Sequence, residues 1–106
     1  MNVEFANSYI PRRMAALGIG DNYYTKAKHI ILLPNQQIEI DGQSQFFILV
    51  DEIAEVTIVS DFGFYDLSYP YINEQSYEHQ GTIQITNNSN STAHVRFIQV
   101  IPINQP

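Results

Sequence analysis

The chain has 106 residues, of which 44% are apolar and only 15% are charged, and its formal net charge at pH 7 is −6. This length predicts one domain, and the apolar content is that of a folded protein rather than a disordered one. The acidic balance argues against nucleic-acid binding, because a phosphate backbone needs a basic patch. The absence of cysteine excludes disulfides, thiolate metal sites and cysteine nucleophiles, and no apolar run is long enough to predict a membrane span.

Residues 1–28 show no sustained hydrophobic period. Pro11 at a helix start and Gly18 just beyond its end allow a helix of one or two turns between them. A helix that short is marginal in isolation, and a loop follows it. We therefore predict an N-terminal arm over residues 1–28, outside the core, and a β-domain over residues 29–106.

The first part of the β-domain predicts short strands separated by turns. Residues 29–33 form an apolar run closed by a Pro-Asn turn, and residues 37–41 alternate, with Ile38 and Ile40 facing inward. The Asp-Gly pair that ends at Gly42 is the strongest two-residue turn signal in the chain. We therefore expect a chain reversal at this pair.

The middle of the chain continues this pattern. Residues 46–50 are apolar on both faces, which predicts a central strand covered on each side. Residues 55–60 are β-branched and strand-like, and a turn ends at Gly63. Residues 64–72 are rich in aromatic residues, but Pro70 interrupts them and favours an edge strand or a strand followed by a loop.

The last part of the chain predicts two further strands. Residues 73–80 and 87–92 are polar loops, and between them residues 81–86 alternate, with Ile83 and Ile85 facing inward. Residues 93–101 form the last strand, whose apolar phase shifts after Phe97, so that it has either a bulge or burial on both faces.

The β-branched and aromatic composition agrees with this pattern, because isoleucine outnumbers leucine by 15 to 5. The chain reads as about seven or eight short strands, without a helix that could cross over between parallel strands. We predict an all-β fold, an antiparallel β-sandwich or small jelly roll with the N-terminal arm.

The sequence holds no arrangement typical of catalysis. The tripeptide that ends at Gly63 spells the magnesium motif of kinases, but the rest of the kinase signature is missing. His29, His79 and His94 lack the spacing of local metal ligands, although separate strands could still bring them together. We expect no enzyme, no catalytic residue, no cofactor and no metal site.

Charge is distributed unevenly along the chain. Residues 1–30 carry four basic side chains against two acids, whereas residues 31–106 carry one arginine against nine acids. A basic leader on an acidic body suggests that the leader meets an acidic surface. That surface is its own body, a neighbouring copy or a different partner.

The arm offers contacts of two kinds for such a partner. Arg12 and Arg13 would form charge-assisted hydrogen bonds to carboxylates. Met14, Leu17 and Ile19 would bury apolar area. We therefore predict these five residues as partner-binding residues.

The aromatic stretch around Pro70 offers a second contact region. Tyrosine gives a large contact area with few rotatable bonds. We expect Tyr69, Tyr71 and Tyr77 at an interface, where they would bind a protein or a sugar ring, and Phe62 and Phe64 in the core.

The layout of the chain also resembles a known family. The segments 10–13 (Ile-Pro-Arg-Arg), 33–35 (Leu-Pro-Asn) and 95–102 (Val-Arg-Phe-Ile-Gln-Val-Ile-Pro), together with the Ile-, Asn- and Tyr-rich composition, carry the resemblance. In these features the chain is similar to small auxiliary (decoration) capsid proteins of tailed bacteriophages, in particular of crAss-like phages. The resemblance carries no diagnostic site residues.

The resemblance implies a structural virion protein. Such a protein would be made in the host cytoplasm, bind the capsid surface through protein-protein interaction and reinforce the lattice without catalysis. We expect a protein lattice as partner, a homo-oligomer of which a trimer is the most plausible form, and no nucleic acid or membrane. The alternative is a small carbohydrate- or peptide-binding β-sandwich module that uses the tyrosine-rich stretch.

Overall fold

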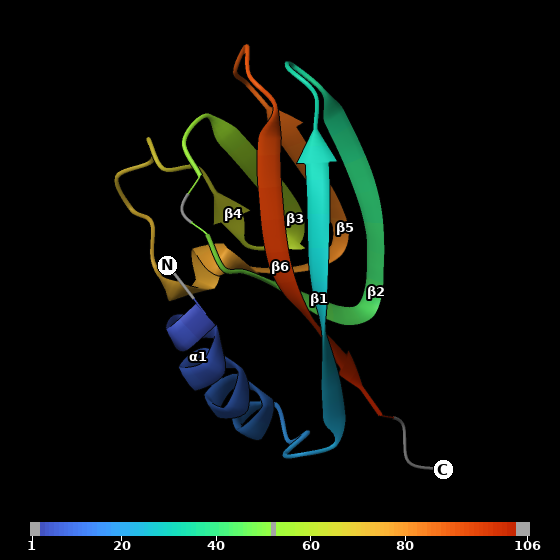
Figure 1. The fold of residues 1–106 in the computed structure, drawn as a ribbon. Coiled ribbons are helices and arrows are strands. Elements are labelled where there is room, and N and C mark those ends of the chain that lie inside the picture. Colours follow the sequence, from blue (N-terminus) through green and yellow to red (C-terminus); the bar gives the residue numbers. More distant parts are fainter. Residues whose placement is uncertain (1–2, 52, 104–106) are drawn as a thin grey trace.

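The computed structural model describes residues 3–51 and 53–103, apart from the side chains of Val3 and Gln43. The first residues of the predicted arm (1–28) and the last residues of the predicted β-domain (29–106) therefore lie outside the described part. In the described part, helix α1 (Val3–Ala16) precedes six strands in one antiparallel sheet, ordered β1-β6-β2-β5-β3-β4 (Figure 1). A short 3-10 helix, η1 (Glu74–Tyr77), precedes β5. The strands are β1 (Tyr23–Leu32), β2 (Gln37–Leu49), β3 (Val56–Phe62), β4 (Phe64–Tyr65), β5 (Glu78–Asn87) and β6 (Ala93–Pro102). The predicted antiparallel, mainly β class is confirmed.

Strand β2 runs unbroken through the Asp-Gly pair, so the predicted turn there is wrong. Its register against β5 shifts between Gly42 and Phe47, and from Phe46 onward it also pairs with β6. A Cβ on Gly42 would lie 2.9 Å from the ring of Phe47 and 3.2 Å from the carbonyl oxygen of Gly81. The glycine therefore permits close packing at an irregularity within one strand, and two predicted strands merge into one.

The main core lies on the inner face of the sheet. All six strands contribute buried side chains to it, which requires the sheet to curl around them. The inward orientation predicted for residues 81–86 is confirmed, because Ile83 and Ile85 are fully buried. The other buried members are Leu32, Phe47, Leu49, Val56, Ile58, Tyr65, Tyr77, Ala93, Val95 and Phe97.

Strand β6 is buried on both faces over part of its length and has no bulge against β1. Its register with β1 is continuous from Tyr23 opposite Pro102 to Leu32 opposite Ala93. Phe97 faces the inner core, whereas Val100 belongs to a second cluster on the outer face. Of the two explanations for the phase shift after Phe97, burial on both faces is therefore correct.

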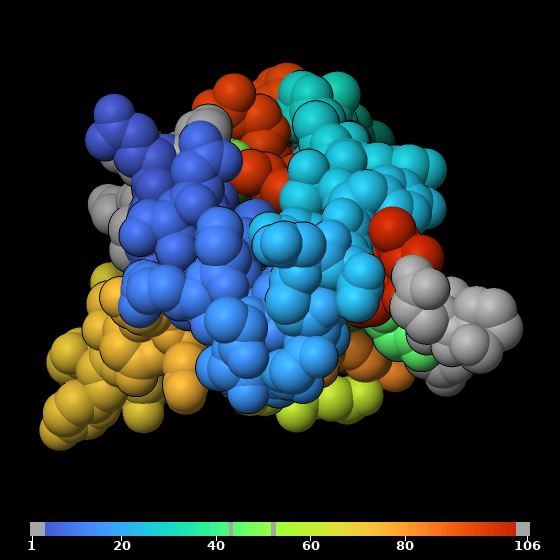
Figure 2. Space-filling view, turned by 90° about the horizontal axis from the view of Figure 1, so that it is seen from below, coloured from blue at the N-terminus to red at the C-terminus, as the bar shows by residue number. Residues whose placement is uncertain are grey.

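Residues predicted as an arm outside the core form a helix that covers part of the outer face of the sheet. Ala6, Tyr9, Ile10 and Met14 are buried and pack with residues of β2 and β6. Figure 2 shows α1, in blue, lying against the body of the protein beside the cyan strand β1. The arm prediction is corrected in this respect, and the predicted boundary after residue 28 falls inside β1.

Helix α1 is longer than the one or two turns that the sequence predicted. Pro11 lies inside α1 rather than at its start, and its side chain is exposed. Gly18 ends the helix with a φ of 77°, as its position in the sequence predicted. The buried pairs Ala6 with Ile10 and Ile10 with Met14 are each four residues apart, which is the spacing of one helical face.

Candidate functional site

Exposed apolar side chains gather on the edge strand β4 and on the loop that follows it. Phe64, Leu67, Tyr69 and Tyr71 are all exposed, and Tyr71 keeps 73% of its surface in contact with solvent. These four residues are called the aromatic surface below. The loop projects from the body of the protein at the lower left of Figure 2, in yellow.

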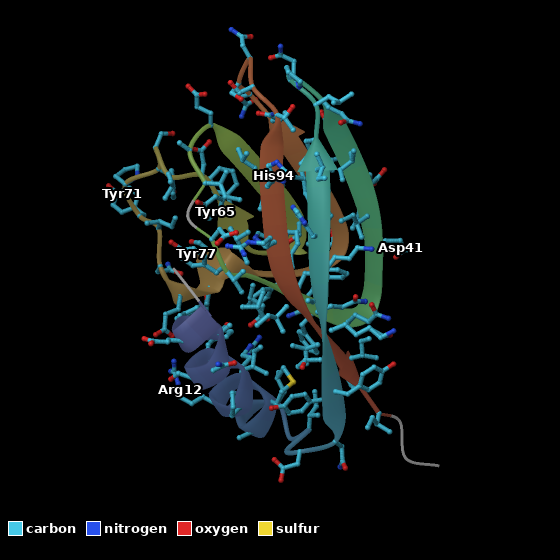
Figure 3. The ribbon with its side chains drawn as sticks, in the orientation of Figure 1. Arg12, Asp41, Tyr65, Tyr71, Tyr77 and His94 are labelled. Atoms are coloured by element: carbon cyan, nitrogen blue, oxygen red, sulfur yellow. The ribbon has the colours of Figure 1, made fainter. Side chains whose placement is uncertain are left out.

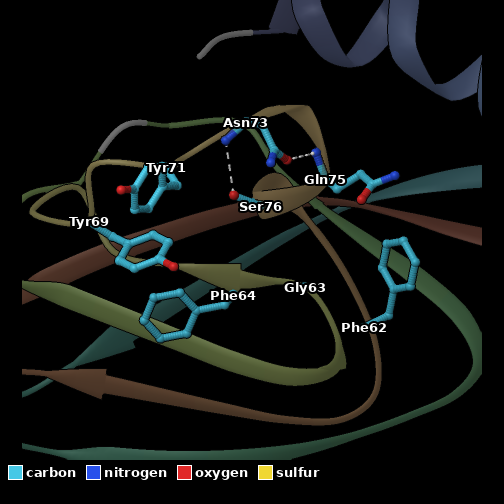
Figure 4. A pocket seen from close by; sticks show the side chains of 8 residues that line it. All are labelled: Phe62, Gly63, Phe64, Tyr69, Tyr71, Asn73, Gln75 and Ser76. Atoms are coloured by element: carbon cyan, nitrogen blue, oxygen red, sulfur yellow. Dashed lines mark hydrogen bonds between the residues drawn. The ribbon is translucent and has the colours of Figure 1, made fainter.

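Within the aromatic surface, the ring of Tyr69 contacts both Phe64 and Tyr71 edge to face. The Phe64 and Tyr69 centroids are 5.4 Å apart with an interplanar angle of 83°, and those of Tyr69 and Tyr71 are 5.6 Å apart with an angle of 72°. Edge-to-face contacts of this kind are favourable beyond the area they bury. They hold neighbouring rings together while leaving their outer sides accessible (Figure 4).

Hydrogen bonds fix both ends of the loop that carries these rings. At its start, Asp66 accepts hydrogen bonds from the backbone N–H of Ser68 (2.9 Å), from the Ser68 hydroxyl (2.7 Å) and from the Thr57 hydroxyl (3.0 Å). The hydrogen bonds from Ser68 are the main reason that the pKa of Asp66 is lowered. At its end, Asn73 caps η1 by accepting from the N–H of Gln75 at 2.9 Å.

A shallow hollow of about 600 Å³ lies among these side chains. Its apolar wall comes from the three rings of the aromatic surface and from Phe62, and its polar wall comes from Asn73, Gln75 and Ser76 (Figure 4). Aromatic rings beside amide groups can bury an apolar group and hydrogen-bond a polar one. The arrangement is suited to binding.

The sequence identified part of this site correctly. Tyr69 and Tyr71 are exposed as expected, whereas Tyr77 is only 4% exposed and packs against Tyr65 inside the protein (Figure 3). Phe64, expected in the core, is exposed, and Phe62 is half-buried. The correction at Tyr77 follows from η1, which turns this residue inward beneath α1 and beside Phe5.

Arg12 and Arg13, which the sequence presented as equivalent, contact different carboxylates of their own chain. Arg13 donates from Nε to Oε1 of Glu78 at 2.8 Å and from Nη2 to Oε2 at 3.3 Å. Glu78 is fully buried, and it also accepts hydrogen bonds from the Tyr9 hydroxyl and the Gln80 amide. Arg12 instead makes an exposed ion pair of 3.5 Å with Glu74.

The environment of Glu78 changes the pKa values of its neighbours. Burial, followed by the hydrogen bond to Glu78, raises the pKa of Tyr9. The hydrogen bond to Glu78 also raises the pKa of Arg13. A buried carboxylate needs a partner charge and hydrogen bonds, and α1 supplies both. Of the three surfaces proposed for the basic leader, its own body is the one it meets in this structure.

The apolar residues predicted for partner binding in this region are not equally accessible. Met14 is fully buried in the chain's own second core, so it is not available to a partner here. Ile19 is half-buried against the same cluster, and Leu17 is 42% exposed. Of the five residues predicted there, only Arg12 and Leu17 present exposed side chains.

The three histidines occupy two different environments. His79 is fully buried on β5, and its Nδ1 lies 3.0 Å from the Ser60 hydroxyl oxygen. Burial lowers the pKa of His79 to about 4. His29 and His94 are exposed and adjacent to each other. No group of three or more histidine, aspartate or glutamate side chains is placed to hold a metal ion within residues 3–51 and 53–103.

Comparisons with known proteins give no relative of this chain. No family model, no curated protein and no solved structure matches it. In the part of the chain that the structure describes, no helix is long and apolar enough to cross a membrane.

Proposed function

We propose that the protein is a structural virion protein that binds the surface of a bacteriophage capsid through its aromatic surface and reinforces the lattice without catalysis. The observation that supports a docking role is the group of four exposed apolar side chains on β4 and on the loop that follows it. Contiguous exposed apolar groups often mark protein contacts, and aromatic residues are enriched there. The capsid is proposed as the partner because of the resemblance of the sequence to auxiliary capsid proteins.

The geometry of the rings favours a protein partner over a sugar. A sugar ring stacks on a flat aromatic face, whereas adjacent rings here are inclined at 83° and 72°. Leu67 and Pro70, both exposed, extend the apolar area beyond the rings. A protruding side chain of a protein lattice would fit the hollow, while the surrounding apolar residues would exclude water from the contact.

A jelly-roll relationship is part of the same proposal. The first strand pairs with the last, the second with the fifth and the third with the fourth, as in a long hairpin that is wound up on itself. Shared core contacts from β1 to β4 support a two-layered arrangement of this curled sheet. In the expected trimer, the buried face of α1 would not be available for contacts between copies, since it packs on its own sheet.

Binding to capsids of the parent phage from which the native protein has been removed tests the proposal. We expect the chain to sediment with these capsids and the double variant Tyr69→Ser/Tyr71→Ser to lose at least about 30-fold in affinity, the loss typical of an interface hot spot. Tyr24→Ser is the matched control, because Tyr24 is a similarly exposed tyrosine on the opposite edge strand. Equal binding by the double variant and the control would contradict the proposed contact.

A second candidate is a carbohydrate- or peptide-binding module, which the polar wall of the hollow supports. Asn73 and Gln75 offer amide donors and acceptors beside the rings of Tyr69 and Tyr71. Chemical-shift changes at these four residues on titration with oligosaccharides or proline-rich peptides would favour this candidate. No change at millimolar ligand, together with capsid binding, would remove it.

A further inference from the structure

Two histidines that are 65 positions apart in the chain meet on the exposed part of the outer face. His29 of β1 lies opposite Arg96, and Ile31 lies opposite His94, so the two histidines are diagonal neighbours on adjacent strands. His29 Nε2 and His94 Nδ1 are hydrogen-bonded to each other at 3.0 Å, one ring donating and the other accepting, and the ring centroids are 5.1 Å apart. Figure 3 shows His94 on β6 beside β1.

We propose that His29 and His94 form a two-histidine binding site for a divalent transition-metal ion, with Cu²⁺ as the best-fitting ion. With metal–nitrogen bonds of about 2.0 Å, two ligands at a right angle place their nitrogens about 2.8 Å apart, and a tetrahedral angle places them about 3.3 Å apart. The observed 3.0 Å is close to the right-angle value. Square-planar Cu²⁺ prefers that angle, and its affinity for nitrogen ligands is the highest in the divalent series.

A metal ion would replace the hydrogen bond between the two rings, and the exposed side chains can reorient around it. Both imidazoles are exposed, and a turn of the rings by which both nitrogen lone pairs point to one metal ion meets no buried packing. The strands that carry them are held in one continuous register along the whole of β1. The spacing of the two ligands is therefore fixed by the backbone, while their orientation is free to adjust.

The surrounding charges are compatible with a cation. Arg96 lies opposite His29, but its Nε and Nη2 donate to the two carboxylate oxygens of Asp51 at 2.7 Å each. This pairing balances the guanidinium charge beside the proposed site. Lys28 precedes His29 on β1, and alternation directs its side chain to the other face of the strand.

Two protein ligands leave the remaining coordination positions to water or to a partner. No third ligating side chain completes the site among the described residues. We therefore expect an exchangeable ion rather than a closed structural site.

Titration of the full chain with Cu²⁺ near pH 7.5, followed by calorimetry and electron paramagnetic resonance, tests the site. We expect one strongly bound Cu²⁺ per chain and a spectrum with two equatorial imidazole nitrogens. His29→Asn and His94→Asn should each lower the affinity at least about tenfold and leave one imidazole in the spectrum. Both residues are exposed, so these variants should fold normally.

Ile31→Asn is the matched control, because Ile31 lies beside the pair on the same face and is 56% exposed. It should bind Cu²⁺ as the unmodified chain does. All variants retain the buried His79, so the differences between them report on the exposed pair alone. Unchanged affinity in both histidine variants, or a spectrum with fewer than two imidazoles in the unmodified chain, would overturn the proposal.

Discussion

Two parts of the outer face of the sheet differ although strand β6 runs through both of them. In the covered part, Ile48, Val50 and Val100 are buried beneath α1. In the open part, Ile31 and His94 are exposed to solvent. Both parts follow the ordinary alternation of a strand, so the difference in burial is due to the helix and not to the sheet.

The comparison shows that the outward-facing residues of a strand are apolar where another element covers that face and polar where it is open. Along β6, His94 and Arg96 point outward where the face is open, whereas Ile98 and Val100 point outward where α1 covers it. The change in pattern therefore marks the edge of the helix footprint. Substitution by a charged residue on each side of that edge tests this interpretation, and it has the largest expected effect on stability.

Val100→Asp should destabilise the protein by about 3–5 kcal/mol, because the carboxylate would be buried without a partner charge. Ile31→Asp, at an exposed position of the same face, should change the stability much less. Urea unfolding of both variants measures the difference. Equal losses would contradict the assignment of a covered part and an open part.

The inner face supplies a test that depends on pH. Unfolded histidine has a pKa near 6.5, and burial lowers the pKa of His79 to about 4, so the unfolded state binds a proton that the folded state does not bind between these values. His79 should therefore lower the stability by about 3 kcal/mol as the pH falls from about 6.5 to about 4, with little further effect of its own below pH 4.

Urea unfolding at several pH values checks this contribution. His79→Leu should reduce the loss of stability in that window, because the leucine side chain cannot bind a proton. An unchanged slope in the variant would show that His79 does not differ in protonation between the two states.

The contact between α1 and β5 gives a smaller effect. Arg13→Ala should cost about 2 kcal/mol, because it removes two hydrogen bonds to Glu78 and leaves a buried carboxylate without its cation, although Arg13 is itself 24% exposed. Arg12→Ala is the matched control and should have little effect, since its ion pair with Glu74 is exposed. Thermal unfolding of both variants makes the comparison.

A second substitution makes the Arg13 result specific. Adding Glu78→Gln to Arg13→Ala should recover part of the lost stability, because the unpaired buried charge is then removed. Further destabilisation in the double variant would indicate that Glu78 stabilises the protein chiefly through Tyr9 and Gln80.

The smallest expected effect on stability is that of Tyr71→Ser, because Tyr71 is 73% exposed. Chemical unfolding should give a free energy within about 0.5 kcal/mol of the unmodified chain, as for most surface substitutions. A loss of more than about 2 kcal/mol would show that Tyr71 supports the fold and is not free for a partner.

Local pattern identified most strands but not the elements that depend on distant contacts. Alternation places Ile83 and Ile85 correctly because their period is set within the strand itself. The Asp-Gly pair at Gly42 is a turn signal by local rules, but packing against Phe47 and Gly81 decides its role. The position of Pro11 predicted a helix of only one or two turns, whereas α1 is longer and is stabilised by burial against β2 and β6.

The candidate site was predictable to the extent that it is local. Tyr69 and Tyr71 stand beside Pro70 in a segment that the sequence already assigned to an edge strand or loop, so their exposure follows. Tyr77 and Arg13 could not be assigned in this way. Tyr77 is turned inward by η1, and Arg13 meets a carboxylate 65 positions away.

The most direct test of the account is a parallel measurement of capsid affinity for Tyr71→Ser and Arg12→Glu. Tyr71 belongs to the aromatic surface and Arg12 to the predicted N-terminal arm, the two regions that the sequence predicted to bind a partner. Both side chains are exposed. The account predicts a loss of binding for Tyr71→Ser and nearly unchanged binding for Arg12→Glu. The reverse result would place the contact on α1 and contradict the role of the aromatic surface.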